Sequence, residues 1–110
     1  KKEDVLIMKP AKIMCDKTEM VVIDESSSRR TMGRIRYDQL INITFDPCTE
    51  RGFLKEIPSE KITLNLKGRE EPLVYFKAKD KDNWDMYKQQ LRKFCKDNRI
   101  SLYDNLTEAE

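Results

Sequence analysis

Apolar residues recur at helical spacing in one long stretch near the end of the chain. Five of them are three, four, three and one positions apart, which places them on one stripe of an α-helix. They are Trp84, Tyr87, Leu91, Phe94 and Cys95. Asp80 and Asp82 are the expected N-caps, and Asn98 is the expected stop. The pattern predicts a helix over residues 82–98, in which Trp84, Leu91 and Phe94 are buried in the core.

Before this helix, apolar and polar residues alternate over short runs, which is the period of a β-strand. The predicted strands are residues 4–15, 20–24, 31–37, 40–45, 53–55, 61–67 and 72–78. Pro10 predicts a bend in the first strand, and Gly33 predicts a bulge in the third. In the fourth strand, Ile41, Ile43 and Phe45 are expected to face the core together.

Proline, glycine and charged residues mark the connections between these strands. Residues 46–52 are expected to form a loop, and residues 57–60 a turn. Residues 100–110 are expected to be a C-terminal tail or linker, part of which docks on the domain. We therefore expect a single, mainly β domain over residues 1–99. Its seven antiparallel strands would form two packed sheets, a barrel that the C-terminal helix closes.

Composition narrows the function classes. The net charge is only +2, from 22 basic and 20 acidic residues, so no global attraction to nucleic acid is expected. Six aromatic residues fall at predicted core positions: Phe45, Phe53, Tyr75, Phe76, Trp84 and Phe94. No apolar run approaches the roughly 20 residues that a membrane-spanning helix needs. No secretory signal is visible, and we expect a cytoplasmic protein, with association at a membrane surface as the alternative.

Enzymatic chemistry has little support in the sequence. Histidine, the commonest general base, is absent. The three cysteines are far apart and match no metal-binding spacing, so reduced thiols are expected. The three glycines are isolated, which excludes a phosphate-binding glycine loop. Carboxylate pairs such as Glu70 and Glu71 are typical of charged turns. We expect no catalytic residues, no metal and no cofactor.

Two stretches carry a resemblance to a known superfamily. Residues 61–80 form a predicted hairpin that leads directly into the helix at residues 82–94, and residues 33–46 combine a basic strand, an acidic turn and an isoleucine-rich strand. This arrangement resembles pleckstrin-homology-like domains, including GRAM-type and bacterial members. The resemblance covers nearly the whole chain and implies a non-catalytic binding or targeting module, an adaptor that mediates protein–protein interaction within a larger protein.

The resemblance also implies phosphoinositide binding on loops at one rim of the barrel. Those loops would be residues 16–19, 38–39 and 68–71, which carry two basic and five acidic residues. A phosphate group gains from converging cations and is repelled by nearby carboxylates. The charge of this rim therefore argues against specific inositide recognition.

The resemblance suggests a peptide groove instead, in which an extended peptide adds to the fifth strand beside the helix. Phe53, Leu54 and Lys55 would form the strand edge, because a short edge strand leaves backbone groups unpaired. Lys88 and Arg92 would line the wall on the helix, and their charge would favour an acidic peptide. Alternatively, the chain's own tail covers this edge.

A second candidate surface is basic. Arg29 and Arg30 end the loop before the third strand, and Arg34 and Arg36 lie on that strand. These residues could attract an anionic membrane lipid, at about 1 kcal/mol per basic residue near a charged bilayer. A solvated loop and strand face is the plainer interpretation.

Overall fold

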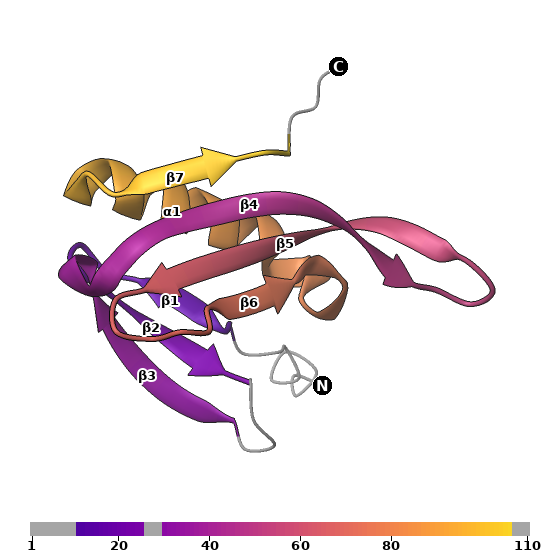
Figure 1. Cartoon of the computed structure of the whole chain (residues 1–110), viewed down its shortest axis with the longest axis horizontal. Helices are drawn as coiled ribbons and strands as arrows, with labels where there is room; N and C mark the ends of the chain where they lie inside the picture. Colours follow the sequence, from indigo (N-terminus) through magenta and orange to yellow (C-terminus); the bar gives the residue numbers. More distant parts are fainter. Residues whose placement is uncertain (1–10, 26–29, 107–110) are drawn as a thin grey trace, which may run out of the picture.

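Seven strands in two sheets and one helix near the C-terminal end make up the fold, as predicted (Figure 1). The structure, a computed structural model, describes residues 11–25 and 30–106. Sheet A has the order β1-β2-β3, and sheet B has the order β6-β5-β4-β7. The strands are β1 (Ile13–Cys15), β2 (Glu19–Asp24), β3 (Thr31–Arg36), β4 (Leu40–Arg51), β5 (Glu56–Leu66), β6 (Leu73–Phe76) and β7 (Ser101–Asp104). Within the described residues the two sheets do not join into a closed barrel.

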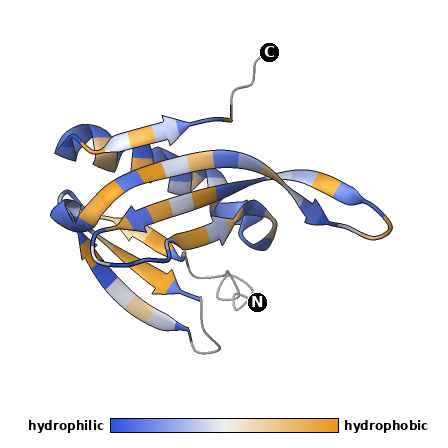
Figure 2. Ribbon diagram, viewed as in Figure 1, coloured by the Kyte–Doolittle hydropathy of each residue, from blue (hydrophilic) through white to orange (hydrophobic). Residues whose placement is uncertain are grey.

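Both sheets contribute to one apolar core. Met20 and Val22 of β2 are buried, because alternate residues of a strand face the same side. They share the core with Ile43 and Phe45 of β4. Figure 2 shows the apolar positions that recur along β2 and β6. Of the predicted first strand, the structure describes only the end, where β1 lies; residues 4–10 and the bend at Pro10 are outside the described residues.

Strand β3 pairs with β2 in continuous register. Val22 lies opposite Gly33, and Met20 lies opposite Ile35. The bulge predicted at Gly33 is therefore wrong. The position opposite a buried valine faces inward, and Gly33 leaves it without a side chain.

The chain passes from sheet A to sheet B through a short 3₁₀ turn at Tyr37–Gln39. The ladder between β4 and β5 shifts between Leu40 and Asn42. Because of that shift, Leu40 is buried and Ile41 is 53% exposed. The prediction that Ile41 faces the core with Ile43 is therefore wrong.

Strands β4 and β5 form one long hairpin where the sequence predicted a loop, a short strand and a turn. Strand β4 continues to Arg51 and β5 begins at Glu56, so the predicted loop at 46–52, strand at 53–55 and turn at 57–60 are wrong. On the outer side of β4, pairing with β7 ends at Phe45, which lies opposite Asp104. On the outer side of β5, pairing with β6 ends at Lys61. We call the two-stranded part beyond these positions, residues 47–60, the arm. It projects from the body of the molecule (Figure 1).

Pro47 and Pro58 are the reason why the sequence predicted a loop and a turn in the arm. At its tip, the Gly52 N–H donates to the Lys55 carbonyl at 2.7 Å. In an antiparallel ladder, pairs that exchange hydrogen bonds alternate with pairs whose backbone groups point outward. Starting from the bonded pair of Gly52 and Lys55, this alternation places Pro58 and Pro47 in pairs of the second kind. Proline is tolerated there because its missing N–H would have had no partner strand.

The tip of the arm exposes two large apolar side chains. Phe53 is 89% exposed and Leu54 is 88% exposed, so the core position predicted for Phe53 is wrong. Leu54 also has a φ of 70°, in the left-handed region that glycine and asparagine occupy most readily. A branched residue in that region costs about 1–2 kcal/mol. The tip thus combines backbone strain with apolar exposure.

Helix α1 (Trp84–Asn98) buries all five residues of its predicted stripe. The predicted N-caps are wrong: Asn83 precedes the helix and makes no side-chain cap bond, and Asp80 lies one 3₁₀ turn earlier. The predicted stop at Asn98 is confirmed. The next residue, Arg99, ends the helix with a φ of 57° and donates its N–H to the Cys95 carbonyl.

The helix also covers the outer edge of β1. The hydroxyl of Tyr87 accepts the Lys12 N–H at 2.7 Å. Gln90 bonds the same edge twice, since its Oε1 accepts the Cys15 N–H at 2.7 Å and its Nε2 donates to the Ile13 carbonyl at 3.3 Å. Helix side chains therefore occupy backbone groups that another strand would need.

After the helix, β7 returns to sheet B and runs parallel to β4. Asn42 pairs with Ser101, and Phe45 pairs with Asp104. Part of the tail docks on the domain, as predicted. The prediction that all strands are antiparallel is wrong, because only the six strands before the helix follow it.

A charged cluster lies where the end of β2 meets the entrance to the helix. Asp80 is the one charged residue of the described chain that is fully buried. Its Oδ2 is 3.1 Å from Lys12 Nζ, which is also 2.9 Å from Glu25 Oε1. Burial opposes the charge of Lys12, but its hydrogen bonds to Glu25 and Asp80 outweigh burial and raise its pKa.

Candidate functional site

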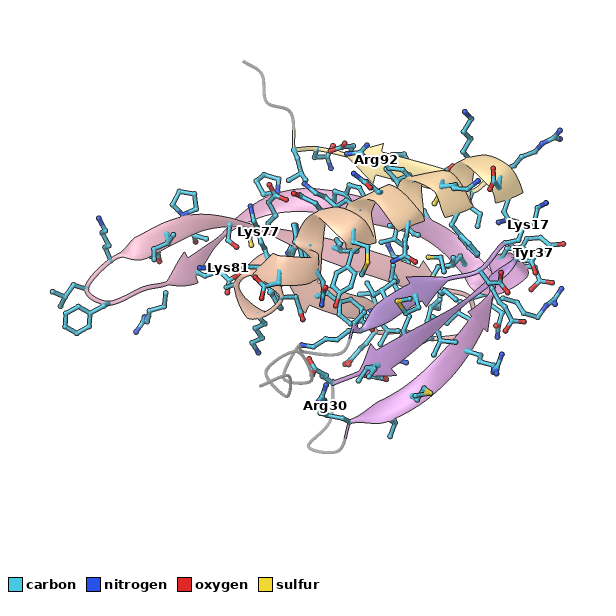
Figure 3. All side chains as sticks on the ribbon, turned by 180° about the vertical axis from the view of Figure 1, so that it is seen from behind. Lys17, Arg30, Tyr37, Lys77, Lys81 and Arg92 are labelled. Carbon is cyan, nitrogen blue, oxygen red and sulfur yellow. The ribbon has the colours of Figure 1, made fainter. Side chains whose placement is uncertain are left out.

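The structure does not assemble the groove predicted beside the helix. Phe53, Leu54 and Lys55 form the tip of the arm rather than an edge strand. Lys88 and Arg92 lie on α1, away from that tip (Figures 1 and 3). At this edge of sheet B, the chain's own strand β7 pairs with β4.

Lys88 contacts the base of the arm. Its Nζ lies 3.0 Å from Glu60 Oε1, and the same oxygen accepts the indole N–H of Trp84 at 2.8 Å. Burial alone would raise the pKa of Glu60, but the bonds from Lys88 and Trp84 outweigh it and lower that pKa. This cluster ties the start of α1 to β5.

The Glu60 cluster predicts a pH dependence. A lowered carboxyl pKa stabilises the fold above the unfolded-state pKa, and this contribution disappears as pH falls through the folded-state pKa. We expect Glu60→Gln to lower the free energy of unfolding by about 1–2 kcal/mol at pH 7. The difference from the unchanged protein should shrink from about pH 5 downward. Urea denaturation at a series of pH values measures this, and a gap that stays constant down to pH 3 would contradict it.

Arg92 holds β7 against the sheet. Its guanidinium lies 2.6 Å from an Asp104 carboxyl oxygen and 5.2 Å from the centre of the Phe45 ring. Burial opposes the charge of Asp104, but bonds from the Leu106 N–H and from Arg92 outweigh it and lower the pKa of Asp104. Figure 3 shows Arg92 on the side of the helix that faces β7. The tail therefore covers β4 at residues 42–45, and it does not cover the predicted edge at residues 53–55, which is exposed.

Three of the four basic residues predicted to attract lipid have an acidic partner in the structure. Arg30 pairs with Glu25 at 3.1 Å, and Arg34 pairs with Glu19 at 2.9 Å. Arg36 lies 3.5 Å from Asp38. Arg29 is outside the described residues. These partners reduce the net positive charge that the surface would present.

Among the edge strands of the described chain, β3 has the longest unpaired edge. It has six residues, whereas β6 and β7 have four each and β1 has three. The edge of β1 is already occupied by helix side chains. Backbone groups on an unpaired edge are available to an added strand.

A cleft of about 270 Å³ lies beside β3, between sheet A and the turn that joins β5 to β6. We call it the β3 cleft. The buried side chains of Val22, Ile35 and Leu73 form the apolar part of its lining, and the exposed side chains of Lys67 and Arg69 lie at its rim. Its lining residues are Val22, Asp24, Thr31, Gly33, Arg34, Ile35, Gln39, Leu66, Lys67, Arg69 and Leu73.

Gly33 keeps the β3 cleft open. A Cβ atom added at Gly33 would meet no atom within 4 Å, and the φ of this residue is not in the left-handed region. Neither close packing nor backbone conformation therefore requires glycine there. A larger side chain at this inward-facing position would enter the cleft.

The rim of the β3 cleft is more basic than acidic. Arg69 pairs with Asp24 at 3.2 Å and bonds the Glu71 carbonyl at 2.9 Å. Lys67 is exposed and forms no ion pair within the described part of the chain. With Arg34, the lining holds three cations and one carboxylate. The cleft therefore combines an apolar floor with a positive rim.

The cysteines do not form a reactive site. Burial raises the pKa of Cys15 to about 12, with a smaller contribution from Cys95. Burial also raises the pKa of Cys95 to about 11. Both thiols stay protonated at neutral pH and are poor nucleophiles. All three cysteines are free.

Comparisons with protein-family models, with curated proteins and with solved structures find no match to this chain. Residues 11–25 and 30–106 contain no helix long and apolar enough to cross a membrane. They also contain no group of His, Cys, Asp or Glu side chains arranged to hold a metal ion. The candidate site therefore rests on the geometry of the β3 cleft.

Proposed function

We propose that the protein is a non-catalytic binding module that takes an extended, acidic segment of a partner protein as an added strand along β3. The observation that carries this proposal is the long unpaired edge of β3 directly beside a cleft with an apolar floor. Extended peptides bind sheet edges through main-chain hydrogen bonds, and adjacent pockets for alternate side chains provide specificity. The edge of β3 offers the main-chain groups, and the β3 cleft offers the pocket.

The ladder between β2 and β3 indicates which backbone groups are available. The Tyr37 N–H donates to the Thr18 carbonyl at 2.9 Å. Because bonded and outward-facing pairs alternate along the ladder, this bond fixes the direction of the backbone groups of β3. Met32 and Arg34 direct theirs away from β2. The Arg36 N–H is taken, because it donates to Gln39 Oε1 at 2.7 Å. A bound peptide would therefore pair mainly with Met32 and Arg34.

The charges around β3 favour an acidic peptide. Lys67 and Arg69 lie at the cleft rim, and Arg34 lies on the outer face of β3 with its side chain 76% exposed. An exposed ion pair such as Arg34 with Glu19 is worth only about 0–1 kcal/mol. A peptide carboxylate could therefore replace Glu19 at little cost.

We further propose that the module is of the pleckstrin-homology-like type. Six antiparallel strands in two sheets, followed by one helix, support this assignment. The parallel strand β7 would then be an addition to the common pattern. The mode of peptide binding is the one expected from the sequence, but at β3 rather than beside the helix.

Substitutions at Gly33 test the proposed site. We expect Gly33→Val to fill the β3 cleft and abolish peptide binding, and Gly33→Ala to weaken it less. Neither should unfold the protein, since glycine in a strand is unfavourable by about 0.5–1 kcal/mol relative to alanine. Thermal denaturation of both variants checks that the fold is intact. Loss of binding without loss of stability would separate a blocked site from a damaged fold.

The binding assay uses a displayed library of ten-residue peptides, selected against the unchanged protein and against Gly33→Val. Peptides selected by the unchanged protein should contain Asp or Glu among alternating apolar residues, and should shift the amide resonances of Met32 and Arg34. Val74→Thr, on the exposed face of β6, is the control and should bind normally. Selected peptides that bind Gly33→Val equally well, or a library that yields no binders, would refute the proposal.

A further inference from the structure

We propose that the tip of the arm inserts Phe53 and Leu54 into the interface of a lipid bilayer. This site is separate from the β3 cleft. The two side chains are adjacent in sequence, almost fully exposed, and lie at the end of a projecting hairpin. Figure 1 shows that no other part of the described chain extends as far in that direction.

The tip holds Leu54, one of this apolar pair, in an unfavourable backbone conformation. Leu54 has a φ of 70°, in a region that asparagine and glycine adopt more readily than leucine. Strain at an exposed position needs an explanation other than packing, because Leu54 has almost no contact with the rest of the protein. Binding through the leucine side chain supplies one.

The arm is unsuited to binding by strand addition. Pro47 and Pro58 occupy outward-facing positions of the two strands, so each outer edge lacks one N–H donor. A partner must therefore contact the tip through side chains.

The size of the tip favours a bilayer over a protein. Phe53 and Leu54 together offer roughly 300–400 Å² of apolar surface. A stable protein interface buries about 800 Å² on each partner. A bilayer interface accepts a small convex tip, because lipids rearrange around it and no matching pocket is required.

The charges near the tip suit an interface with anionic headgroups. Arg51 and Lys55 flank the apolar pair, and neither forms an ion pair within the described residues. Glu50 is directed to the base of the arm, where its Oε2 accepts from Ser59 Oγ at 2.9 Å and from the Ala78 N–H at 3.4 Å. Glu56 is the remaining acidic residue beside the turn. The tip itself is therefore slightly positive.

The base of the arm is held firmly. Glu60 binds both Trp84 and Lys88 of the helix. Lys77, labelled in Figure 3, lies beside this base, with its Nζ 4.0 Å from Glu60 Oε2. A tip mounted on a fixed hairpin loses little conformational entropy on insertion, which favours binding by a small apolar area.

Vesicle co-sedimentation tests the inference. The probes are vesicles of phosphatidylcholine alone and vesicles containing 30% phosphatidylserine. We expect the protein to bind the phosphatidylserine vesicles, and Phe53→Ser/Leu54→Asn to reduce the partition coefficient at least tenfold. Asparagine also relieves the strain at position 54, so the double variant should be no less stable. Met32→Ser, which removes another exposed apolar side chain, should bind like the unchanged protein.

A fluorescence measurement locates the inserted residue. In Phe53→Trp, the new indole is exposed whereas Trp84 is buried, so a blue shift of the emission on adding vesicles reports insertion of the tip. Gly33→Val should keep vesicle binding, which distinguishes this site from the β3 cleft. Absence of vesicle binding at low salt would overturn the inference and leave a protein contact as the role of the tip. So would binding that survives the double variant but is lost when Arg30, Arg34 and Arg36 are reversed to Glu.

Discussion

Replacing Trp84 with alanine should lower the free energy of unfolding by about 3–5 kcal/mol. The side chain is 1% exposed, and its ring lies edge-on to that of Tyr87 with 6.1 Å between ring centres. The variant loses this packing, leaves a cavity and frees Glu60 from its indole partner. Urea denaturation followed by circular dichroism measures the loss.

Trp84→Phe is the matched control for this prediction. It keeps most of the buried ring but removes the 2.8 Å bond from the indole N–H to Glu60. We expect a smaller loss, about 1–3 kcal/mol, because a half-buried acceptor loses one of its two partners. If the alanine variant unfolded at the same urea concentration as the unchanged protein, Trp84 would not be a core residue.

Replacing Lys12 with methionine should also cost about 3–5 kcal/mol, because it leaves the buried Asp80 carboxylate without its cation. The side chain of Asp80 is 2% exposed and that of Lys12 is 11% exposed. Asp80 Oδ1 already lacks a hydrogen-bond partner among the described residues. Lys12 is the residue that forms an ion pair with Asp80 in the described chain, so the substitution leaves this carboxylate unpaired.

A double variant separates the charge effect from a general packing defect. Lys12→Met/Asp80→Leu removes both charges, and we expect it to recover most of the stability that Lys12→Met loses. The free energies of unfolding of the two single variants and the double variant give the coupling between the residues. Simple additivity of the single losses would contradict a pair that stabilises each charge through the other.

The helix was predictable because its pattern is local. All five residues of the apolar stripe are buried, and the spacing that revealed them is a property of one segment. The caps were not predictable, since Asp80 is used by Lys12, which is distant in the sequence. A capping residue and the partner of a distant lysine look the same in a sequence.

The arm was missed for a related reason. Pro47 and Pro58 read as loop signals, because proline usually interrupts a strand. Whether it does so depends on which side of the strand its nitrogen faces, and this follows from a pairing that the local sequence does not show. The apolar pair at residues 53 and 54 was a usable signal, since apolar residues are uncommon in a turn.

The β3 cleft depends on two features that a strand pattern cannot show. Gly33 lies opposite the buried Val22, so its missing side chain opens a space in the core face. The far wall comes from the turn after β5, whose position depends on how the two sheets pack. The sequence suggested an edge strand as a peptide site, but it could not predict that the tail pairs with β4 and leaves the outer edge of β3 unpaired.

The pairing of β7 with β4 has a consequence for folding kinetics. The hairpins β1-β2-β3 and β4-β5-β6 join neighbours in the sequence and close short loops, whereas β7 pairs across the whole helix and two strands. Contacts between residues far apart in the sequence form late, because the chain loses the entropy of a long loop before the contacts stabilise it. We therefore expect β7 to dock after the transition state, so that substitutions in it accelerate unfolding and leave the folding rate unchanged.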